Sequence, residues 1–162
     1  MLSEIRSNKN ELPLRQLGKT GLQVSIVSFG GGHFVSKNLE VQESIRLLHH
    51  AIDEGMNFMD TAWEYGQGES ERRMGLGLQD RREKVVFMTK VCSRDAKIAE
   101  EQLHESLDRL KTDVIDVWQF HEINYDNDAE LISGEYDLKP IDVKEIILSW
   151  ASDSPPMPNV IG

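Results

Sequence analysis

Four apolar runs of the sequence each end at a residue of possible functional importance, and these four residues recur at a nearly constant spacing. Three of them can hold or move a proton, and the fourth is a glycine. They are Gly30, Asp60, Lys90 and His121, which follow the runs 25–29, 57–59, 85–89 and 114–120. The steps between them are 30, 30 and 31 residues. One strand with the helix after it has about this length, so the spacing indicates a series of βα units. In such a series the four positions meet at the carboxyl edge of a parallel sheet.

The residue types at these positions suit acid–base chemistry on a carbonyl group. Tyr65 lies five residues beyond Asp60, in the loop that would follow that strand. An ammonium group such as Lys90 beside a phenol stabilises the phenolate, and a nearby carboxylate keeps the ammonium charged and oriented. Such a set, with His121 on the carbonyl oxygen, can polarise a C=O bond and deliver a proton to the developing alkoxide. The other reactant must come from elsewhere, and hydride from a nicotinamide is the natural candidate.

Each of these residues also has a purely structural interpretation. Asp60 could cap the start of a loop, Lys90 could be a solvated lysine, and His121 could be a buried histidine with one backbone partner. The common period and the presence of Tyr65 favour the functional interpretation for the set. We expect no activated nucleophile and no metal site. Cys92 is predicted to be a small core residue, with a place in the cleft left open because it follows Lys90 by two positions.

The elements that must position these side chains follow from the apolar periodicity. Two short runs around Gly18–Gly21 predict a β-hairpin. Helical spacing predicts helices between Asn38 and Gly55, over 68–79 and over 96–110. With the four apolar runs, the predicted order is a hairpin followed by β-α-β-α-β-α-β, which implies a parallel sheet. The predicted fold class is therefore α/β, a parallel (β/α) barrel of TIM type with about its first four units present.

The sequence changes character after His121. One short helix is predicted over 142–151, with Ile146–Leu148 as an alternative strand, and the end from 152 to 162 is rich in proline. We therefore divide the chain into a partial barrel over 1–126 and a divergent tail over 127–162.

The composition is typical of a globular protein that remains in solution. Of 162 residues, 39% are hydrophobic and 28% are charged, and the net charge is −10. An acidic surface argues against nucleic acid and anionic membranes as partners. One cysteine excludes a disulfide framework, and no apolar run approaches ~18 residues. Because the first residues also lack a signal-peptide core, we expect a cytoplasmic protein.

The segments Asp60-Thr-Ala-x-x-Tyr-Gly66, Thr89-Lys90 and Gln119-Phe-His121 resemble the aldo-keto reductase superfamily. The opening segment 14–24 is similar to the hairpin that closes the bottom of the barrel in those enzymes. The resemblance runs from about Leu12 to about Asp126. It implies a (β/α)₈ barrel that interconverts aldehydes or ketones and alcohols with NADPH or NADH.

The resemblance also assigns roles to individual residues. It implies a catalytic tetrad of Asp60, Tyr65, Lys90 and His121, in which the tyrosine is the general acid. It further implies that Asp60 and the glycine stretch, Gly30, Gly31 and Gly32, approach the nicotinamide end of the cofactor. The expected substrate is a small carbonyl compound or alcohol.

The sequence departs from the family in its second half. The family's later strands supply most of the contacts to the cofactor, and no matching residues follow Asn127. We expect a chain truncated after its fourth strand, with exposed strand edges that favour self-association or pairing with another half barrel. The alternative function is therefore a non-enzymatic interaction or regulatory protein, or an inactive fragment that binds a partner through those edges.

Overall fold

The computed structural model describes residues 12–36, 39–124 and 127–128. Its centre is a four-stranded sheet in which neighbouring strands are all parallel and follow chain order. The strands are β3 (Phe29–Gly30), β4 (Phe58–Asp60), β5 (Val86–Val91) and β6 (Val117–Phe120). Such an arrangement needs a crossover connection after each strand, and the helices provide it.

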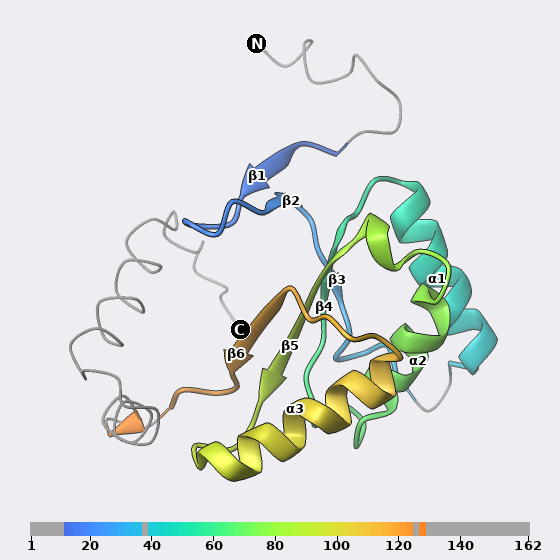
Figure 1. Ribbon diagram of the computed structural model, residues 1–162. Helices are drawn as coiled ribbons and strands as arrows, with labels where there is room; N and C mark the ends of the chain where they lie inside the picture. Colours follow the sequence, from blue (N-terminus) through green and yellow to red (C-terminus); the bar gives the residue numbers. More distant parts are fainter. Residues whose placement is uncertain (1–11, 37–38, 125–126, 129–162) are drawn as a thin grey trace, which may run out of the picture.

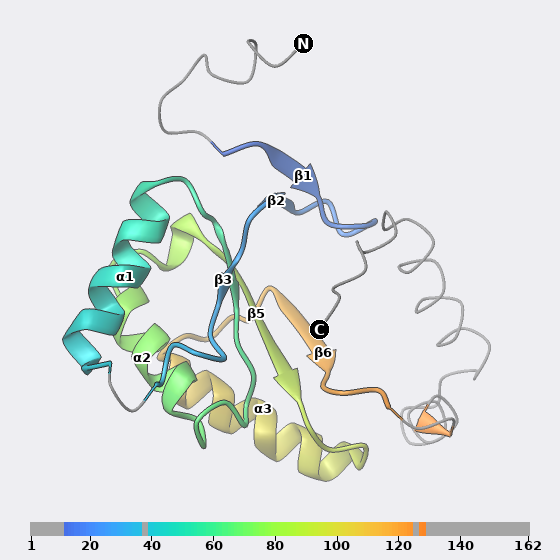
Figure 2. The ribbon, with the colours of Figure 1, turned by 180° about the vertical axis from the view of Figure 1, so that it is seen from behind.

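Three helices lie on the same side of this sheet (Figure 1, Figure 2). They are α1 (Val41–Asp53), α2 (Glu69–Leu78) and α3 (Ala96–Leu110), and a short 3₁₀ helix, η2 (Arg82–Lys84), precedes β5. The predicted α/β class and partial TIM-type barrel are therefore confirmed. The described residues contain three βα units and the strand of the fourth, and the sheet does not close within them. In the part of the chain that the structure describes, every helix is too short or too polar to cross a bilayer.

The predicted hairpin is present as β1 (Leu14–Gln16) and β2 (Gln23–Ser25), paired antiparallel. Asn57, just before β4, fastens it to the sheet. The Ser25 backbone N–H donates to Asn57 Oδ1 at 2.7 Å, and Asn57 Nδ2 donates to the Gln23 carbonyl at 3.0 Å. The hairpin is therefore held at the amino end of β4, opposite the edge where the candidate site forms.

The first strand is shorter than the apolar run that predicted it. Ser25 belongs to the hairpin, and only Phe29 and Gly30 pair with β4. Ile26 and Val27 between them are exposed. The run of apolar and β-branched residues predicted one continuous strand. The structure interrupts this strand, because Ser25 is held in the hairpin by Asn57.

Three other element boundaries also differ from the sequence prediction. Helix α1 begins at Val41 with Glu40 at its N-cap, whereas Asn38, the predicted cap, lies outside the described residues. Strand β5 continues one residue past Lys90, and β6 begins at Val117 rather than at Val114, which is exposed. The helix and the possible strand predicted within 142–151 lie outside the described residues.

The core fills the space between the helices and the sheet. Phe87 and Met59 from the strands pack with Leu48 of α1 and Met74 of α2, and all four are at most 1% exposed. Burying a side chain of this size stabilises the fold by about 1.5 to 3 kcal/mol. The cluster holds β4 and β5 against α1 and α2, and so fixes the strands that carry the candidate site.

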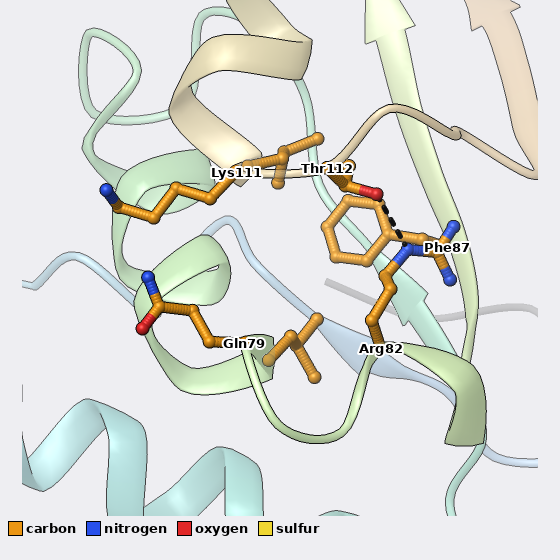
Figure 3. Close-up of a pocket in the computed structure, with 7 residues that line it drawn as sticks. Gln79, Arg82, Phe87, Lys111 and Thr112 are labelled. Carbon is orange, nitrogen blue, oxygen red and sulfur yellow. Dashed lines mark hydrogen bonds between the residues drawn. The ribbon is translucent and has the colours of Figure 1, made fainter.

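A polar clamp closes the amino ends of β5 and β6. Arg82 binds the Asp116 carboxylate at 2.7 Å, and the same carboxylate oxygen accepts from the Phe87 backbone N–H at 2.7 Å. A small pocket opens here, lined by Leu78, Gln79, Arg82, Phe87, Leu110, Lys111 and Thr112 (Figure 3). Arg82 Nε donates to Thr112 Oγ1 across its rim at 3.3 Å. This pocket belongs to the structural clamp and lies at the end of the strands opposite the candidate site.

We predict that Gly75→Ala destabilises the fold. A Cβ at Gly75 of α2 would lie 2.7 Å from Leu110 Cα and closer still to the Arg109 carbonyl oxygen. Alanine gains about 1 kcal/mol of helix propensity. The clash involves backbone atoms that cannot rotate away, so the overpacking cost prevails. Urea denaturation should show a net loss of about 1 to 3 kcal/mol in the free energy of unfolding.

Gly30→Ala is the matched control for this measurement. A Cβ at Gly30 meets no atom within 4 Å, so the free energy of unfolding should change by less than about 0.5 kcal/mol. An equal effect of the two substitutions would contradict the close packing of α2 against α3.

Candidate active site

The site is centred on Lys90, whose ammonium group is enclosed between β4 and β5. Its side chain is 8% exposed, and it forms an ion pair with Asp60 at the end of the neighbouring strand. Lys90 Nζ also donates to the Thr61 carbonyl at 2.6 Å. Because the strands are parallel and adjacent, both side chains reach the same edge of the sheet. A carboxylate and a carbonyl therefore hold the ammonium in place from the β4 side.

Tyr65 lies in the turn after β4, beside this ion pair. Lys90 Nζ is 4.8 Å from the centroid of the Tyr65 ring, a distance at which a cation and a ring attract each other. The ring is also close to the glycine stretch, because a Cβ on Gly32 would be 3.8 Å from Tyr65 Cε2. The phenol therefore lies close to both the Lys90 cation and the backbone of Gly32.

The turn that carries Tyr65 is fixed by an unusual backbone. Gly66, Gln67 and Gly68 have φ values of 58°, 57° and 83°, all in the left-handed region. A Cβ at Gly66 would meet Val35 Cγ2 at 2.5 Å, and one at Gly68 would meet the Arg109 guanidinium at 2.6 Å. Helix α2 begins directly after this turn. Both glycines are favoured by conformation, and Gly66 is also required by space, so the turn has little freedom to move Tyr65.

His121 directly follows β6 and completes the group. Its backbone N–H donates to the Val91 carbonyl of β5 at 2.8 Å. Its ring meets the Tyr65 ring edge-on, with centroids 5.5 Å apart and an interplanar angle of 77°. In the described part of the chain, the polar contacts of the ring run to Nδ1, with Glu64 Oε1 at 3.0 Å and Cys92 Sγ at 3.8 Å. Nε2 is thus the ring atom left for a substrate.

The structure therefore brings together the four predicted side chains, Asp60, Tyr65, Lys90 and His121, in a continuous series of contacts. Their catalytic roles stay predictions.

The glycine stretch after β3 lies beside this group. The Gly31 N–H donates to the Asp60 carbonyl at 2.7 Å. A Cβ on Gly31 would meet Ser70 Oγ at 2.5 Å and Thr61 Oγ1 at 2.9 Å, so this glycine is needed for packing. Gly30 and Gly32 are exposed, and a Cβ on Gly30 would enter open space. Their predicted contact with a cofactor stays a prediction, and the packing role of Gly31 is an addition to it.

A buried polar network beneath the site was not predicted. Glu71 of α2 is fully buried and accepts a hydrogen bond from Thr89 Oγ1 at 2.7 Å. Arg109 of α3 binds Glu71 Oε2 at 3.2 Å and the Trp63 carbonyl at 2.9 Å. A buried carboxylate is tolerated only when it is paired and hydrogen-bonded in this way. The network fixes Thr89, the neighbour of Lys90, and Trp63, which precedes Tyr65 by two residues.

Arg94, whose role the sequence did not indicate, joins the loops after β5 and β6. Its Nη1 donates to the Cys92 carbonyl and its Nη2 to the His121 carbonyl, both at 2.9 Å. Its Nε lies 3.3 Å from Asp128 Oδ1. The sequence carries no local signal for this role, because the carbonyls that it binds are separated by 29 residues. Arg94 positions the backbone on which His121 is carried.

Cys92 lies at the rim of the site rather than in the core. It is half-buried, with its sulfur near the His121 ring. Burial raises the pKa of the Cys92 thiol to about 11, and the negative charge and hydrogen bond of Glu64 add to the effect. The thiol is therefore almost entirely protonated at neutral pH and is a weak nucleophile.

We predict that Cys92 is alkylated slowly in the folded chain. Since the thiolate is the reactive form, a pKa of about 11 lowers its population at pH 8 about a hundredfold relative to an ordinary thiol. Labelling with iodoacetamide should therefore be at least about a hundredfold slower folded than in urea. The folded rate should keep rising between pH 8 and pH 10. The chain has one cysteine, so mass spectrometry reports this site alone.

Glu64→Gln is the companion variant for this measurement. It removes the charge that opposes the thiolate, so labelling should become faster. A folded rate equal to that in urea would contradict the described environment of Cys92.

Comparison with known proteins gives a consistent result. The Aldo/keto reductase family model matches residues 26–153. A protein of Bacillus subtilis named uncharacterized oxidoreductase YqkF is 32% identical, over 91% of this chain and 50% of its own. A 6-dehydroglucose reductase of Novosphingobium aromaticivorans is 33% identical, over 69% of this chain and 43% of its own. The chain thus spans about half the length of these curated relatives.

Solved structures agree with the sequence matches. The holo form of aldo-keto reductase AKR11C1 from Bacillus halodurans superposes with a TM-score of 0.69 at 27% identity, covering 89% of this chain and 55% of the other. The match to the family model extends past residue 126. The predicted boundary between a partial barrel and a divergent tail at that residue stays a prediction. The parallel βα units, the cluster at their carboxyl edge and these matches agree that the chain belongs to the aldo-keto reductase family of oxidoreductases.

Proposed function

We propose that this chain carries the proton-transfer half of a cytoplasmic reductase that interconverts aldehydes or ketones and alcohols with NADPH or NADH. The observation that supports this function best is the series of contacts from Asp60 through Lys90 and Tyr65 to His121. It joins an acid–base group to a fixed cation and to an imidazole at one edge of the sheet.

Tyr65 is the proposed proton donor. As a carbonyl is reduced, its oxygen becomes an alkoxide, and the phenol hydroxyl gives it a proton. The Lys90 ammonium stabilises the phenolate that remains, and its enclosure strengthens that interaction relative to water. Asp60 and the Thr61 carbonyl keep the ammonium fixed, so no reorganisation is required during the reaction.

His121 is proposed to hold the carbonyl oxygen through Nε2. In the proposed complex both ring nitrogens carry a proton. Nδ1–H donates to Glu64 Oε1, which lies 3.0 Å away and orients the ring, and Nε2–H donates to the carbonyl oxygen. The edge-on contact with Tyr65 keeps the two rings adjacent, so a single substrate oxygen can receive a hydrogen bond from both.

The residues at the carboxyl end of β3 fit the reacting end of a nicotinamide cofactor. The open space beside Gly30 and the exposed backbone of Gly32 admit close approach of a flat ring next to Tyr65. Asp60 lies across from Gly30 in the sheet register. When bound, the nicotinamide supplies the hydride that this chain's side chains cannot provide. We propose a small carbonyl compound as substrate, and a sugar aldehyde or ketone belongs in any test because one relative is a 6-dehydroglucose reductase.

The outer strand of the sheet supports a second candidate function, binding of another half barrel or a second copy. Strand β6 is the last strand of the described sheet, and Val114 and Ile123 on either side of it are 52% and 42% exposed. An outer strand flanked by exposed apolar side chains favours pairing with another chain. Concentration-dependent sedimentation without cofactor oxidation would favour this function over the reductase.

We predict that Tyr65→Phe abolishes most of the reductase activity. Removing the hydroxyl deletes the proton donor and leaves the ring contacts, so kcat should fall by about 10² to 10⁴. KM should change little. The assay follows loss of NADPH or NADH absorbance with a panel of aromatic aldehydes, ketones and sugar aldehydes.

Tyr136→Phe is the control, because it removes the same atom from a tyrosine that is not among the predicted site residues. Quenching of the fluorescence of Trp63, Trp118 and Trp150 by NADPH tests cofactor binding separately. Equal activity in the two tyrosine variants would exclude Tyr65 as the acid. Absence of both quenching and turnover would exclude the reductase function for this chain.

A further inference from the structure

We propose that Glu64, Cys92 and His121 form a binding site for one Zn²⁺ ion at the rim of the candidate active site. This site goes beyond the reductase function, which needs no metal. It also differs from the expectation drawn from the sequence, where these three residues are too far apart to indicate a metal site.

The fold brings the three donors together from consecutive units. Cys92 directly follows β5, His121 directly follows the adjacent β6, and Glu64 lies in the turn after β4. One donor atom from each lies within 4.8 Å of the others. The His121 Nδ1 atom is 3.0 Å from Glu64 Oε1 and 3.8 Å from Cys92 Sγ.

These separations are close to those of a tetrahedral zinc site. Ligands bound at about 2.0 to 2.3 Å in tetrahedral geometry lie about 3.3 to 3.7 Å from one another. Glu64 must make the largest adjustment, and its side chain is 48% exposed, so it is free to move. Cys92 and His121 need to shift by only tenths of an ångström.

The donor types favour zinc over the hard cations Mg²⁺ and Ca²⁺. A thiolate and an imidazole are poor ligands for Mg²⁺ and Ca²⁺ and good ones for Zn²⁺. Three protein ligands leave a fourth position for water. On binding, the Cys92 thiol gives its proton to solvent, so the two negative charges of thiolate and carboxylate balance the ion.

The backbone around the two strand-end ligands is held before any ion arrives. Arg94 donates to the carbonyls of both Cys92 and His121 at 2.9 Å. Gln102 Oε1 accepts from the Cys92 N–H at 3.0 Å. The Tyr65 ring packs edge-on against His121. Binding therefore costs little ordering of these two ligands, which favours affinity.

Occupancy would also affect His121 itself. Coordination through Nδ1 leaves the ring proton on Nε2, the atom proposed to hold the carbonyl oxygen. This consequence rests on the proposed function, whereas the metal site does not.

The test is a titration of the chelator-treated chain with Co²⁺, which replaces Zn²⁺ and reports a bound thiolate by a near-ultraviolet charge-transfer band. We expect the band to appear with one ion per chain and to be displaced by Zn²⁺. Cys92→Ser should abolish the band. Glu64→Gln and His121→Asn should weaken binding at least about tenfold.

His104→Gln is the matched control, because His104 is exposed on α3 away from the cluster. It should leave the band and the affinity unchanged, and Zn²⁺ should raise the melting temperature of this variant and of the natural chain but not of Cys92→Ser. No thiolate band in the natural chain, or equal affinity in Cys92→Ser, would overturn the metal site. Neither result would affect the Tyr65→Phe comparison, so the two proposals fail independently.

Discussion

The enclosed ammonium of Lys90 is the constraint around which the rest of the site is arranged. Moving a charge out of water costs several kcal/mol, and that cost is met only when partners lie at the right distance. Asp60 and the Thr61 carbonyl provide them, at the end of β4 and directly after it. The Lys90 ammonium can therefore be buried only where β4 pairs with β5. Tyr65 and His121 are then placed relative to a charge that cannot shift.

Much of this arrangement could be predicted because it depends on local pattern. The apolar stripe of α3 predicted a helix over 96–110, which is the span observed. The nearly constant period placed Asp60, Lys90 and His121 at neighbouring strand ends, since parallel strands in chain order share one edge. The first strand was predicted too long, because the apolar run from Ser25 carries no sign that Asn57 would hold its first residue in the hairpin.

The supporting interactions could not be predicted, because each joins residues far apart in the chain. Arg109 reaches Glu71 across two helices, and Arg94 reaches the carbonyl of His121. An arginine in a polar helix or loop is usually a solvated surface residue, so its sequence context gives no signal. The same applies to Glu64 and Cys92, which meet at His121 only after three strands have paired. The roles of these residues depend on how the βα units pack against one another, and the sequence pattern within one unit does not reveal that packing.

The strand order β3-β4-β5-β6 has a consequence for how the protein is made. Each strand pairs with the one synthesised just before it, so the contacts that build the sheet span about one βα unit. A crossover of about 30 residues must close before each pairing forms, so this sheet is expected to form more slowly than a bundle of helices with local contacts. Lys90 can meet Asp60 only after β5 has been synthesised, and His121 follows Lys90 by 31 residues. The charged pair can therefore form before the imidazole is part of the chain.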